Sequence, residues 1–392
     1  MPYIEKLPLI FLEEIACICY NKGKEKDRKG EGGGQMDKKV LVGMSGGVDS
    51  SVAAFLLQQQ GYQVVGITFK LWNPEEEDGL PSSCCSVDDV NDARLVCDRL
   101  GIPHYVFNYK ELFRQKVVDP FIQAYLQGKT PNPCIACNRH IKFDAFLSKA
   151  LSMDFSYIAT GHYACVDWDS SSGRYRLRRS AYLPKDQSYV LYHLTQQQLA
   201  HTLMPLGGYT KAQVRQIAAQ QGLLVKDKAE SQDICFIPDG DTSGFLSRHL
   251  PSEGETAGNF LDLQGRVLGR HRGIWNYTIG QRKGLGLSFP QPMYVCRIDP
   301  EANAVVLSEN DRLFSDTLTV GELNWLSIPT PNSPIPVQAK IRYSHIPAPA
   351  MLYPTDGEQV RLVFSTPQRA ITRGQAAVFY DGELLLGGGV IL

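Results

Sequence analysis

The chain has 392 residues, 43% of them hydrophobic, and a formal net charge of −1 at pH 7. This length allows two or three domains with cores of their own, and no stretch approaches the ~20 uninterrupted apolar residues that a membrane helix requires. Because the net charge is close to zero, local basic patches must hold any nucleic-acid partner.

The ten cysteines and the N-terminal region bear on the compartment in which the protein is found. The apolar run near the N-terminus is broken by Glu13 and Glu14, whereas signal peptides lack acidic residues there. We therefore expect thiols in a reducing compartment, the cytoplasm, and no membrane segment. Residues 1–35 are predicted to be a disordered or non-native extension, since a charged, Gly-rich stretch follows the apolar run.

The first predicted strand is the β-branched, apolar run Lys38–Val42, and the helix formers of Ser51–Gln58 predict a helix. Between them stands Gly43-Met44-Ser45-Gly46-Gly47-Val48-Asp49-Ser50. A strand, a Ser/Gly turn and a helix N-terminus form an anion site, because the glycines let backbone N–H groups approach a phosphate. The spacing is neither the Walker nor the dinucleotide pattern. It resembles the PP-loop of ATP pyrophosphatases, which split ATP into AMP and pyrophosphate.

Strand and helix signals alternate through the first half of the chain. Further strands are predicted at Gln63–Phe69, Pro103–Asn108 and Tyr157–His162, and helices at Asp88–Leu100, Glu111–Leu126 and Ile141–Leu151. This alternation is typical of an α/β fold with a doubly wound parallel sheet. Ligands of such sheets bind beyond the carboxyl ends of the strands, where we expect Ser45, Phe69 and Gly161 to cluster.

The pattern changes around Gly207–Gly208. A helix is predicted at Thr210–Ala218 with Thr210 as its N-cap, and the alternation then ends. Short β-branched runs separated by Gly, Pro and Asn predict a small antiparallel β-barrel. These runs are Arg266–Leu268, Tyr294–Ile298, Ala304–Leu307, Val337–Tyr343, Gln359–Phe364 and Ala376–Tyr380. The predicted domains are a catalytic domain at 36–206, a central domain at 207–285 and the barrel at 286–392.

Three cysteines are candidates for chemistry. Cys134 and Cys137 follow two prolines and Asn132, which predict an extended turn, and Cys137 precedes a predicted helix. Thiols at helix N-termini and beside arginines have lowered pKa values. A Cys-x-x-Cys pair can be a redox pair, half of a zinc site or a nucleophile, and zinc needs about four ligands. Cys235 follows an acidic, polar run that favours a surface loop, although a lone cysteine is often a buried structural thiol.

Six segments in order resemble motifs of the bacterial tRNA-specific 2-thiouridylase family. They are Ser45–Ser50, Thr130–Asn138, Ala159–Tyr163, Lys185–Tyr189, Glu230–Phe236 and Pro367–Gln375. The resemblance runs from about Met36 to the C-terminus and leaves residues 1–35 outside it. It implies a PP-loop catalytic domain, a central domain that carries the loop of the second catalytic cysteine, and a tRNA-binding barrel.

The resemblance implies ATP-dependent sulfur transfer to C2 of wobble uridine 34 in the tRNAs for Lys, Glu and Gln. ATP and Mg²⁺ would be held by the loop, and Phe69 and Gly161 would touch the adenosine. The loop residues are Gly43, Met44, Ser45, Gly46, Gly47, Val48, Asp49 and Ser50. Adenylation of the C2 oxygen makes AMP the leaving group. A persulfide on Cys235, loaded by a sulfur-relay protein or a cysteine desulfurase, would then give 2-thiouridine, AMP and pyrophosphate.

Cys137 would be the second catalytic thiol in this resemblance, either assisting release of sulfide or closing a Cys137–Cys235 disulfide. A disulfide needs Cα atoms within ~7 Å, so the loop around Cys235 would have to move. Residues implied to contact tRNA or the target base are Asn132, Pro133, Cys134, His162, Lys185, Asp186, Gln187, Arg342, Tyr343 and Gln375. Singly, Lys185 and Arg342 are ordinary surface charges, Phe69 a core residue and His162 a satisfied hydrogen-bonding residue.

Cys134 is a departure, because part of the family has Asp at this position. The change opens an alternative in which Cys134, Cys137 and Cys235 hold a [4Fe–4S] cluster with one open iron. Two other functions remain: a PP-loop ligase acting on a small molecule, and a tRNA-binding module that has lost catalysis. The ligase needs no reactive cysteine pair, and the binding module would need a damaged loop.

Overall fold

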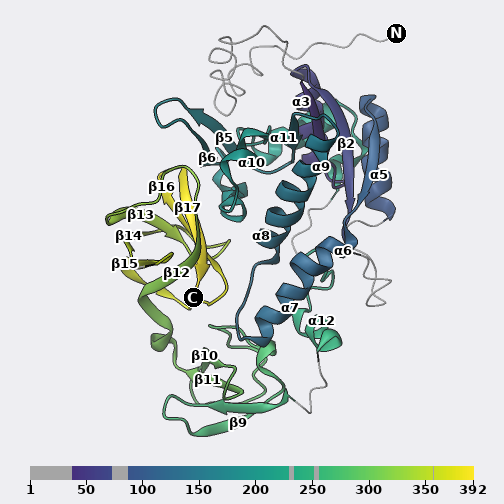
Figure 1. The fold of residues 1–392 in the computed structure, drawn as a ribbon. Coiled ribbons are helices and arrows are strands. Elements are labelled where there is room, and N and C mark those ends of the chain that lie inside the picture. The colour runs from purple at the N-terminus through teal and green to yellow at the C-terminus, as the bar shows by residue number, and fades with distance from the viewer. Residues whose placement is uncertain (1–37, 73–86, 229–233, 251–255, 356) are drawn as a thin grey trace.

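The computed structural model describes residues 38–72, 87–228, 234–250, 256–355 and 357–392. The predicted N-terminal extension, residues 1–35, lies outside the described residues. Two β-rich parts and one parallel sheet with its helices are distinct in Figure 1.

The first sheet is parallel throughout and has the strand order β3-β2-β1-β4-β7. Its strands are β1 (Lys39–Gly43), β2 (Gln63–Lys70), β3 (His104–Asn108), β4 (Tyr157–Ala159) and β7 (Thr202–Leu203). The chain order reverses direction across the sheet at β1 and β4, and ligand sites of α/β folds lie at such a point. The predicted parallel sheet is confirmed.

Helices cover both faces of this sheet. The helices that cover it are α3 (Val48–Gln59), α5 (Val87–Leu100), α9 (Phe146–Ser152) and α11 (Lys211–Gln220). Further helices of the described residues are α6 (Lys110–Phe113), α7 (Asp119–Leu126), α8 (Pro133–Cys137), α10 (Gln196–Ala200) and α12 (Thr242–His249). Val40 and Val42 of β1 share a buried cluster with residues of α3, α5 and α11. Leu41 lies in another cluster with Phe146 of α9. Successive side chains of a strand face opposite ways, so both faces are buried.

Two helical runs differ from the prediction. The predicted helix Glu111–Leu126 is divided by the π-helical segment η1 (Arg114–Val118), and α7 begins directly after it with Pro120 near its start. Proline has no N–H to donate, which interrupts the regular α-helical ladder. The predicted helix Ile141–Leu151 begins earlier, at Pro133, and continues through the π-helical segment η2 (Asn138–Ala145). Cys134 and Cys137 therefore lie on the helix itself, because the Asn132 side chain caps it.

A second sheet has the order β10-β11-β8-β9 and lies at the lower end of the molecule in Figure 1. Its strands are β8 (Gly258–Leu261), β9 (Val267–His271), β10 (Tyr294–Asp299) and β11 (Ala304–Ser308). The β11–β8 pair is parallel, and the outer pairs are antiparallel. β10 and β11 fall within residues 286–392, which were predicted as the barrel, yet they pair within this sheet.

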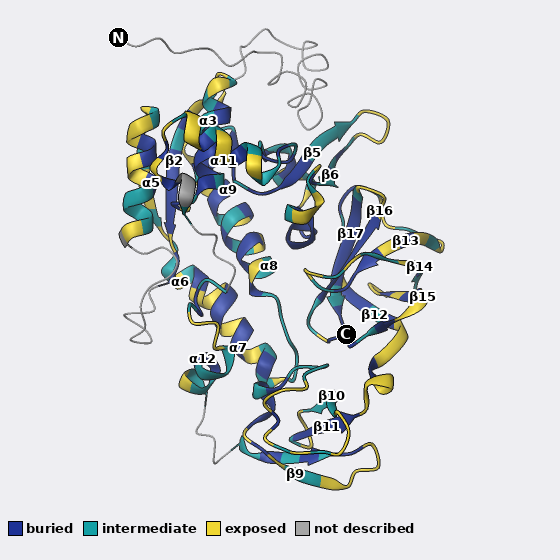
Figure 2. Ribbon diagram, turned by 180° about the vertical axis from the view of Figure 1, so that it is seen from behind, coloured by how far each residue is buried: buried dark blue, intermediate teal, exposed yellow. Residues whose placement is uncertain are grey.

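Six antiparallel strands close the C-terminal barrel, in the order β12-β15-β14-β13-β16-β17 with β17 pairing back to β12. They are β12 (Phe314–Trp325), β13 (Ile335–Lys340), β14 (Ala348–Pro354), β15 (Val360–Arg369), β16 (Ala376–Asp381) and β17 (Leu384–Ile391). Figure 2 shows buried residues along these strands, and closure leaves the barrel without a bare edge. The predicted antiparallel barrel is confirmed.

A hairpin ties the first half of the chain to the barrel. β5 (Ala164–Asp169) and β6 (Arg174–Arg179) pair with each other, and β6 also pairs with β17. This hairpin follows β4 directly, so the barrel is anchored beside the carboxyl edge of the parallel sheet.

The barrel also touches the segment that leads into α8. The Gln375 side-chain amide donates to the Thr130 carbonyl at 2.7 Å, and the Thr130 N–H donates to the Arg373 carbonyl at 2.9 Å. Gly374, with φ +88°, has no room for a side chain, since an added Cβ would lie 2.9 Å from Lys129 Cβ.

None of the described helices is long and apolar enough to cross a membrane.

Gly374→Ala tests how closely the barrel packs against the segment Lys129–Thr130. Gly357 provides a matched control, because its φ is +90° and nothing lies within 4 Å of an added Cβ. Both alanines suffer backbone strain of about 1–2 kcal/mol. We expect Gly374→Ala to lower the free energy of unfolding by a further ~1–3 kcal/mol through overlap with Lys129 and Thr130, measured by urea denaturation. Equal losses in the two variants would contradict a tight contact.

Candidate active site

The Ser/Gly loop between β1 and α3 is built around hydroxyl and backbone groups. Ser50 Oγ accepts from the Ser45 N–H at 3.2 Å and donates to the Gly47 carbonyl at 3.1 Å. Gly46 has φ +70°, and a Cβ there would lie 2.5 Å from the Asp89 carbonyl oxygen. Only glycine fits this position, so the loop is held tightly against the start of α5. Gly47 then begins α3 without a side-chain cap, leaving backbone N–H groups for an anion.

The segment that follows the neighbouring strand β4 approaches the loop as closely as its backbone permits. At Gly161, a Cβ would lie 2.8 Å from the Ser50 amide nitrogen. Phe69 at the end of β2 packs edge-on against Phe146, with 4.8 Å between ring centroids. Phe69 is thus a core residue that also lines the cavity described next. Ser45, Phe69 and Gly161 do meet at the carboxyl edge of the sheet.

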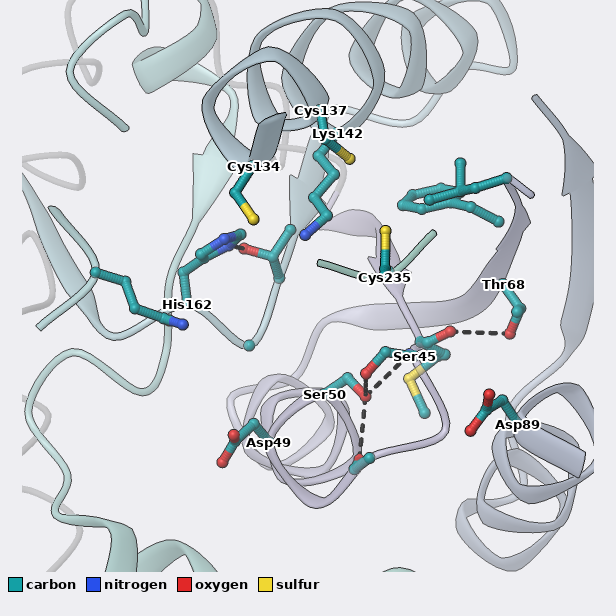
Figure 3. Close-up of a pocket in the computed structure, with 18 of the residues that line it drawn as sticks. Ser45, Asp49, Ser50, Thr68, Asp89, Cys134, Cys137, Lys142, His162 and Cys235 are labelled. Carbon is teal, nitrogen blue, oxygen red and sulfur yellow. Dashed lines mark hydrogen bonds between the residues drawn. The ribbon is translucent and has the colours of Figure 1, made fainter. Parts of the chain in front are cut away.

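A cavity of about 400 Å³ opens at this edge and joins the loop to the cysteines. It is lined by these predicted residues: Gly43, Met44, Ser45, Gly47, Val48, Asp49, Ser50, Phe69, Pro133, Cys134, Cys137, Gly161, His162, Lys185, Gln187 and Cys235. Figure 3 shows the loop on one side of this cavity and Cys134, Cys137 and Cys235 on the other. Residues far apart in the sequence therefore meet around one space, which is large enough for a small ligand.

The three cysteines differ in exposure. Cys134 is exposed, Cys137 is buried and Cys235 is half-buried, and all three are thiols. Cys137 belongs to the hydrophobic cluster that also contains Leu41 and Phe146, and Cys235 packs against the same cluster. Within the described residues, no group of three or more His, Cys, Asp or Glu side chains is arranged to hold a metal ion. The three thiols therefore do not converge on one point in this conformation, as a cluster would require.

Asp49 of the loop is the partner of two side chains that sequence reasoning missed. Lys211 Nζ lies 2.8 Å from each carboxylate oxygen, and the Tyr163 hydroxyl donates to Oδ1 at 2.7 Å. Lys211 is the first residue of α11, where Thr210 and Gln213 form a reciprocal capping box. The cap was recognisable in the sequence, but nothing there connected Lys211 with Asp49.

Lys142 and Lys228 also line the cavity and were not predicted. Lys228 Nζ donates to Asp89 Oδ1 at 2.7 Å and to Asp92 Oδ2 at 2.5 Å, which fixes the chain just before the Cys235 segment to α5. Lys142 comes from η2, the same helical run as Cys137. The lysines make the cavity suitable for an anionic ligand.

His162 is buried beside the cysteines and bonds Thr160 Oγ1 through Nδ1 at 2.8 Å. Burial lowers the pKa of His162 well below its usual value, and the Lys142 ammonium and His193 lower it further. His162 is consequently neutral at physiological pH. A neutral imidazole has one donor and one acceptor nitrogen, and with Nδ1 bonded to Thr160 only Nε2 is left for a ligand.

Of the predicted Lys185–Gln187 run, Lys185 and Gln187 line the cavity and Asp186 does not. Asp186 is buried, and it accepts from the Ser180 N–H at 3.1 Å and the Ser188 hydroxyl at 2.9 Å. These bonds hold the turn that presents its neighbours. The direct tRNA contact that the resemblance implies for Asp186 stays a prediction.

The remaining predicted residues lie outside the cavity lining. Asn132 is the N-cap of α8, accepting from the Cys134 N–H at 3.0 Å, and Gly46 shapes the loop from behind. Gln375 bonds Thr130, as described above. The Arg342 side chain donates to the Ala370 carbonyl and to Thr372 Oγ1. Tyr343, 44% exposed, lies edge-on to Tyr189.

Three family models together match most of the described chain. Residues 38–239 match the tRNA methyl transferase HUP domain, 243–309 the tRNA methyl transferase PRC-barrel domain, and 315–391 the aminomethyltransferase beta-barrel domain. The tRNA-specific 2-thiouridylase MnmA of Clostridioides difficile is 51% identical over 91% of this chain and 98% of that protein. The protein of the same name from Carboxydothermus hydrogenoformans is 54% identical over 90% of this chain and 97% of that protein.

Among solved structures, a 4-thiouridine synthetase in complex with RNA and ATP is similar over 54% of this chain and 50% of that chain. The sequence identity is 16% and the TM-score 0.34.

The buried histidines near this site predict how stability depends on pH. Burial lowers the pKa of His193 to about 3, with Arg139 the next contribution, whereas an unfolded chain has a histidine pKa of about 6.5. The unfolded state therefore binds the proton first, and stability is lost as pH falls from about 6.5 toward 3. At pH 5.5, a buried histidine with a pKa lowered this far reduces the free energy of unfolding by about 1.4 kcal/mol relative to pH 7.5.

We expect His193→Gln to lose less stability between pH 7.5 and 5.5 than the wild-type chain does, by about 1.4 kcal/mol. Urea denaturation at both pH values measures this difference, and the comparison within each variant cancels any packing defect. The same pH dependence in both proteins would show that His193 does not contribute.

Proposed function

The chain belongs to the tRNA-specific 2-thiouridylase family, and from that premise we propose how its cavity replaces the C2 oxygen of a tRNA uridine with sulfur. One observation carries the proposal: a phosphate-binding loop and the thiols Cys137 and Cys235 line a single cavity. Activation by ATP and replacement by sulfur then take place without moving the uridine to a second site.

ATP is the activating substrate, and its phosphates bind at the loop between β1 and α3. The backbone N–H groups at the start of α3, which have no side-chain cap, suit a phosphate chain, and Gly46 and Gly161 let the neighbouring backbones pack closely against the loop that presents them. Phe69 and Gly161 contact the adenosine. Mg²⁺ would be held by oxygens of ATP and of a nearby carboxylate, and it would offset the charge of the phosphates. Asp49 and Asp89 are the carboxylates in the cavity lining, and here they bond Lys211 and Lys228.

The uridine is activated through its C2 oxygen. This oxygen attacks the α-phosphorus of ATP, pyrophosphate leaves with the electron pair of the broken P–O bond, and the N3 proton is released. A carbonyl oxygen is a poor leaving group, whereas AMP is a good one. Neutral His162 bonds Thr160 through Nδ1 and has Nε2 left to form one hydrogen bond with a uridine edge.

Cys235 carries the incoming sulfur as a persulfide. Its terminal sulfur attacks C2, and the C2–O bond breaks with release of AMP. Cys137 then attacks the Cys235 sulfur, so that the S–S bond breaks, 2-thiouridine leaves and a Cys137–Cys235 disulfide forms. The electrons balance because the transferred sulfur is reduced while the two cysteines are oxidised. A thiol reductant resets the pair, and a sulfur-relay protein or cysteine desulfurase reloads Cys235.

The tRNA enters from the side of the cavity that faces the barrel, in the same cytoplasmic compartment that supplies ATP. Lys185 and Gln187 line the cavity, and Asn132 and Pro133 begin the helix that carries Cys134. Tyr343, Arg342 and Gln375 lie on the barrel side. A target base in an anticodon loop, here uridine 34 of the tRNAs for Lys, Glu and Gln, must be splayed from its stack to reach C2.

Transfer of labelled sulfur to unmodified tRNA tests this function. We expect wild-type enzyme with ATP and a persulfide donor to label tRNA, and Cys235→Ala to abolish labelling. Cys296→Ala is the matched control, since Cys296 is another half-buried thiol, on β10, far from the cavity lining. A small-molecule ligase would turn over ATP without tRNA and would tolerate the loss of Cys137 and Cys235.

Anaerobic purification with iron analysis distinguishes the persulfide route from the [4Fe–4S] alternative. We expect colourless, iron-free enzyme that still thiolates tRNA, because Cys134, Cys137 and Cys235 do not converge in the described structure. Cys134→Asp, which restores the residue found in part of the family, should then remain active. Stoichiometric iron that is required for activity and is lost in Cys134→Asp would favour the cluster.

A further inference from the structure

Among the described residues that line the cavity, Lys142 is the lysine on the same helical run as Cys137. We propose that Lys142 is a further catalytic residue, whose ammonium group binds the α-phosphoryl oxygens as the phosphoryl group passes from pyrophosphate to the uridine oxygen. This inference rests on the proposed function, because it assumes that the C2 oxygen is adenylated in this cavity.

The helical geometry places Lys142 beside Cys137. In an α-helix, residues five positions apart point about 140° away from each other. Here the run changes to the π-helical segment η2 at Asn138, and the Phe146 N–H bonds the Ile141 carbonyl five residues back. Five-residue spacing therefore brings side chains to the same face. Figure 3 shows Cys137 and Lys142 together, and both line the cavity.

The ammonium end of Lys142 points into the cavity and not toward the solvent face of the helix. In Figure 3 it lies between Cys134 and Cys235, on the cysteine side of the Ser45–Ser50 loop. Its charge also acts on buried His162, whose pKa it helps to lower. A cation thus stands next to the position where the uridine is expected to bind.

The reaction geometry requires the α-phosphorus to occupy this region. At the moment of adenylation, the α-phosphorus is bonded on one side to the departing pyrophosphate, which the loop holds. On its other side it is bonded to the C2 oxygen, whose carbon must be within reach of the Cys235 sulfur. The phosphoryl group therefore lies between the loop and the cysteines, the space into which Lys142 projects.

The other lysines of the lining have different places. Lys211 bonds Asp49 of the loop, and Lys228 bonds Asp89 and Asp92 of α5, so both belong to the phosphate end of the cavity. Lys185 comes from the turn η3 (Leu183–Lys185) beside the barrel. Lys142 alone among the described cavity lysines comes from the cysteine-bearing run. A fixed cation there offsets charge that develops on the phosphoryl oxygens and, later, on departing AMP.

Two stereoisomers of ATPαS, in which one nonbridging α-oxygen is sulfur, test this contact directly. We expect Lys142→Met to slow ATP- and tRNA-dependent AMP formation by about 10²–10³-fold, with persulfide loading of Cys235 unchanged. Wild-type enzyme should discriminate between the two isomers, and Lys142→Met should lose most of that discrimination, because the replaced oxygen no longer has its partner. Lys149→Met is the control, an exposed lysine of α9 two turns further along the run.

Lys142→Arg keeps a cation and provides a second test if Lys142→Met does not fold. We expect it to recover at least tenfold of the lost rate and to retain isomer discrimination. The proposal is overturned if Lys142→Met discriminates between the isomers as before at an undiminished rate, if Lys142→Arg folds but retains neither the isomer discrimination nor any of the rate, or if Lys149→Met is equally impaired. Failure of the proposed function has a different signature, since wild-type enzyme itself would then form no AMP in response to tRNA.

Discussion

The carboxylate of Asp49 holds the active site together. It receives Lys211 from the start of α11 and the hydroxyl of Tyr163 from the chain after β4, while its own backbone belongs to the phosphate loop. Hydrogen bonds to a charged group are about twice as strong as neutral ones. Three segments that are distant in sequence are thus fixed around one anion-binding loop, and the glycines at 46 and 161 let their backbones approach.

The sequence was most informative where local pattern and local geometry coincide. The strand at Lys39–Gly43, the loop and the helix α3 follow one another without interruption, so spacing alone predicted them. Prediction was weaker in the barrel, where β17 contains three successive glycines and β14 contains Pro349 and ends at Pro354. Such residues normally argue against strands. Closure of the barrel supplies the pairing partners that make these strands stable.

The lysines of the cavity could not be predicted for a different reason. Lys142, Lys211 and Lys228 act through positions set by tertiary structure, and a lysine in a helix is ordinarily a solvated charge. The π-helical turn that carries Lys142 to the face of Cys137 has no simple sequence signature. Cys134, Cys137 and Cys235 were recognised through motif order, and their meeting with the loop in one cavity is what the fold adds.

The contact between the barrel and Thr130 has a mechanical consequence. Gly374 sits against Lys129 and Thr130 with no slack, and two hydrogen bonds join the same segments. The chain from Thr130 then runs through the Asn132 cap into the helix of Cys134 and Cys137. These contacts couple the position of the barrel to the position of this helix. A shift of the barrel would therefore also move the start of the helix that carries Cys134 and Cys137.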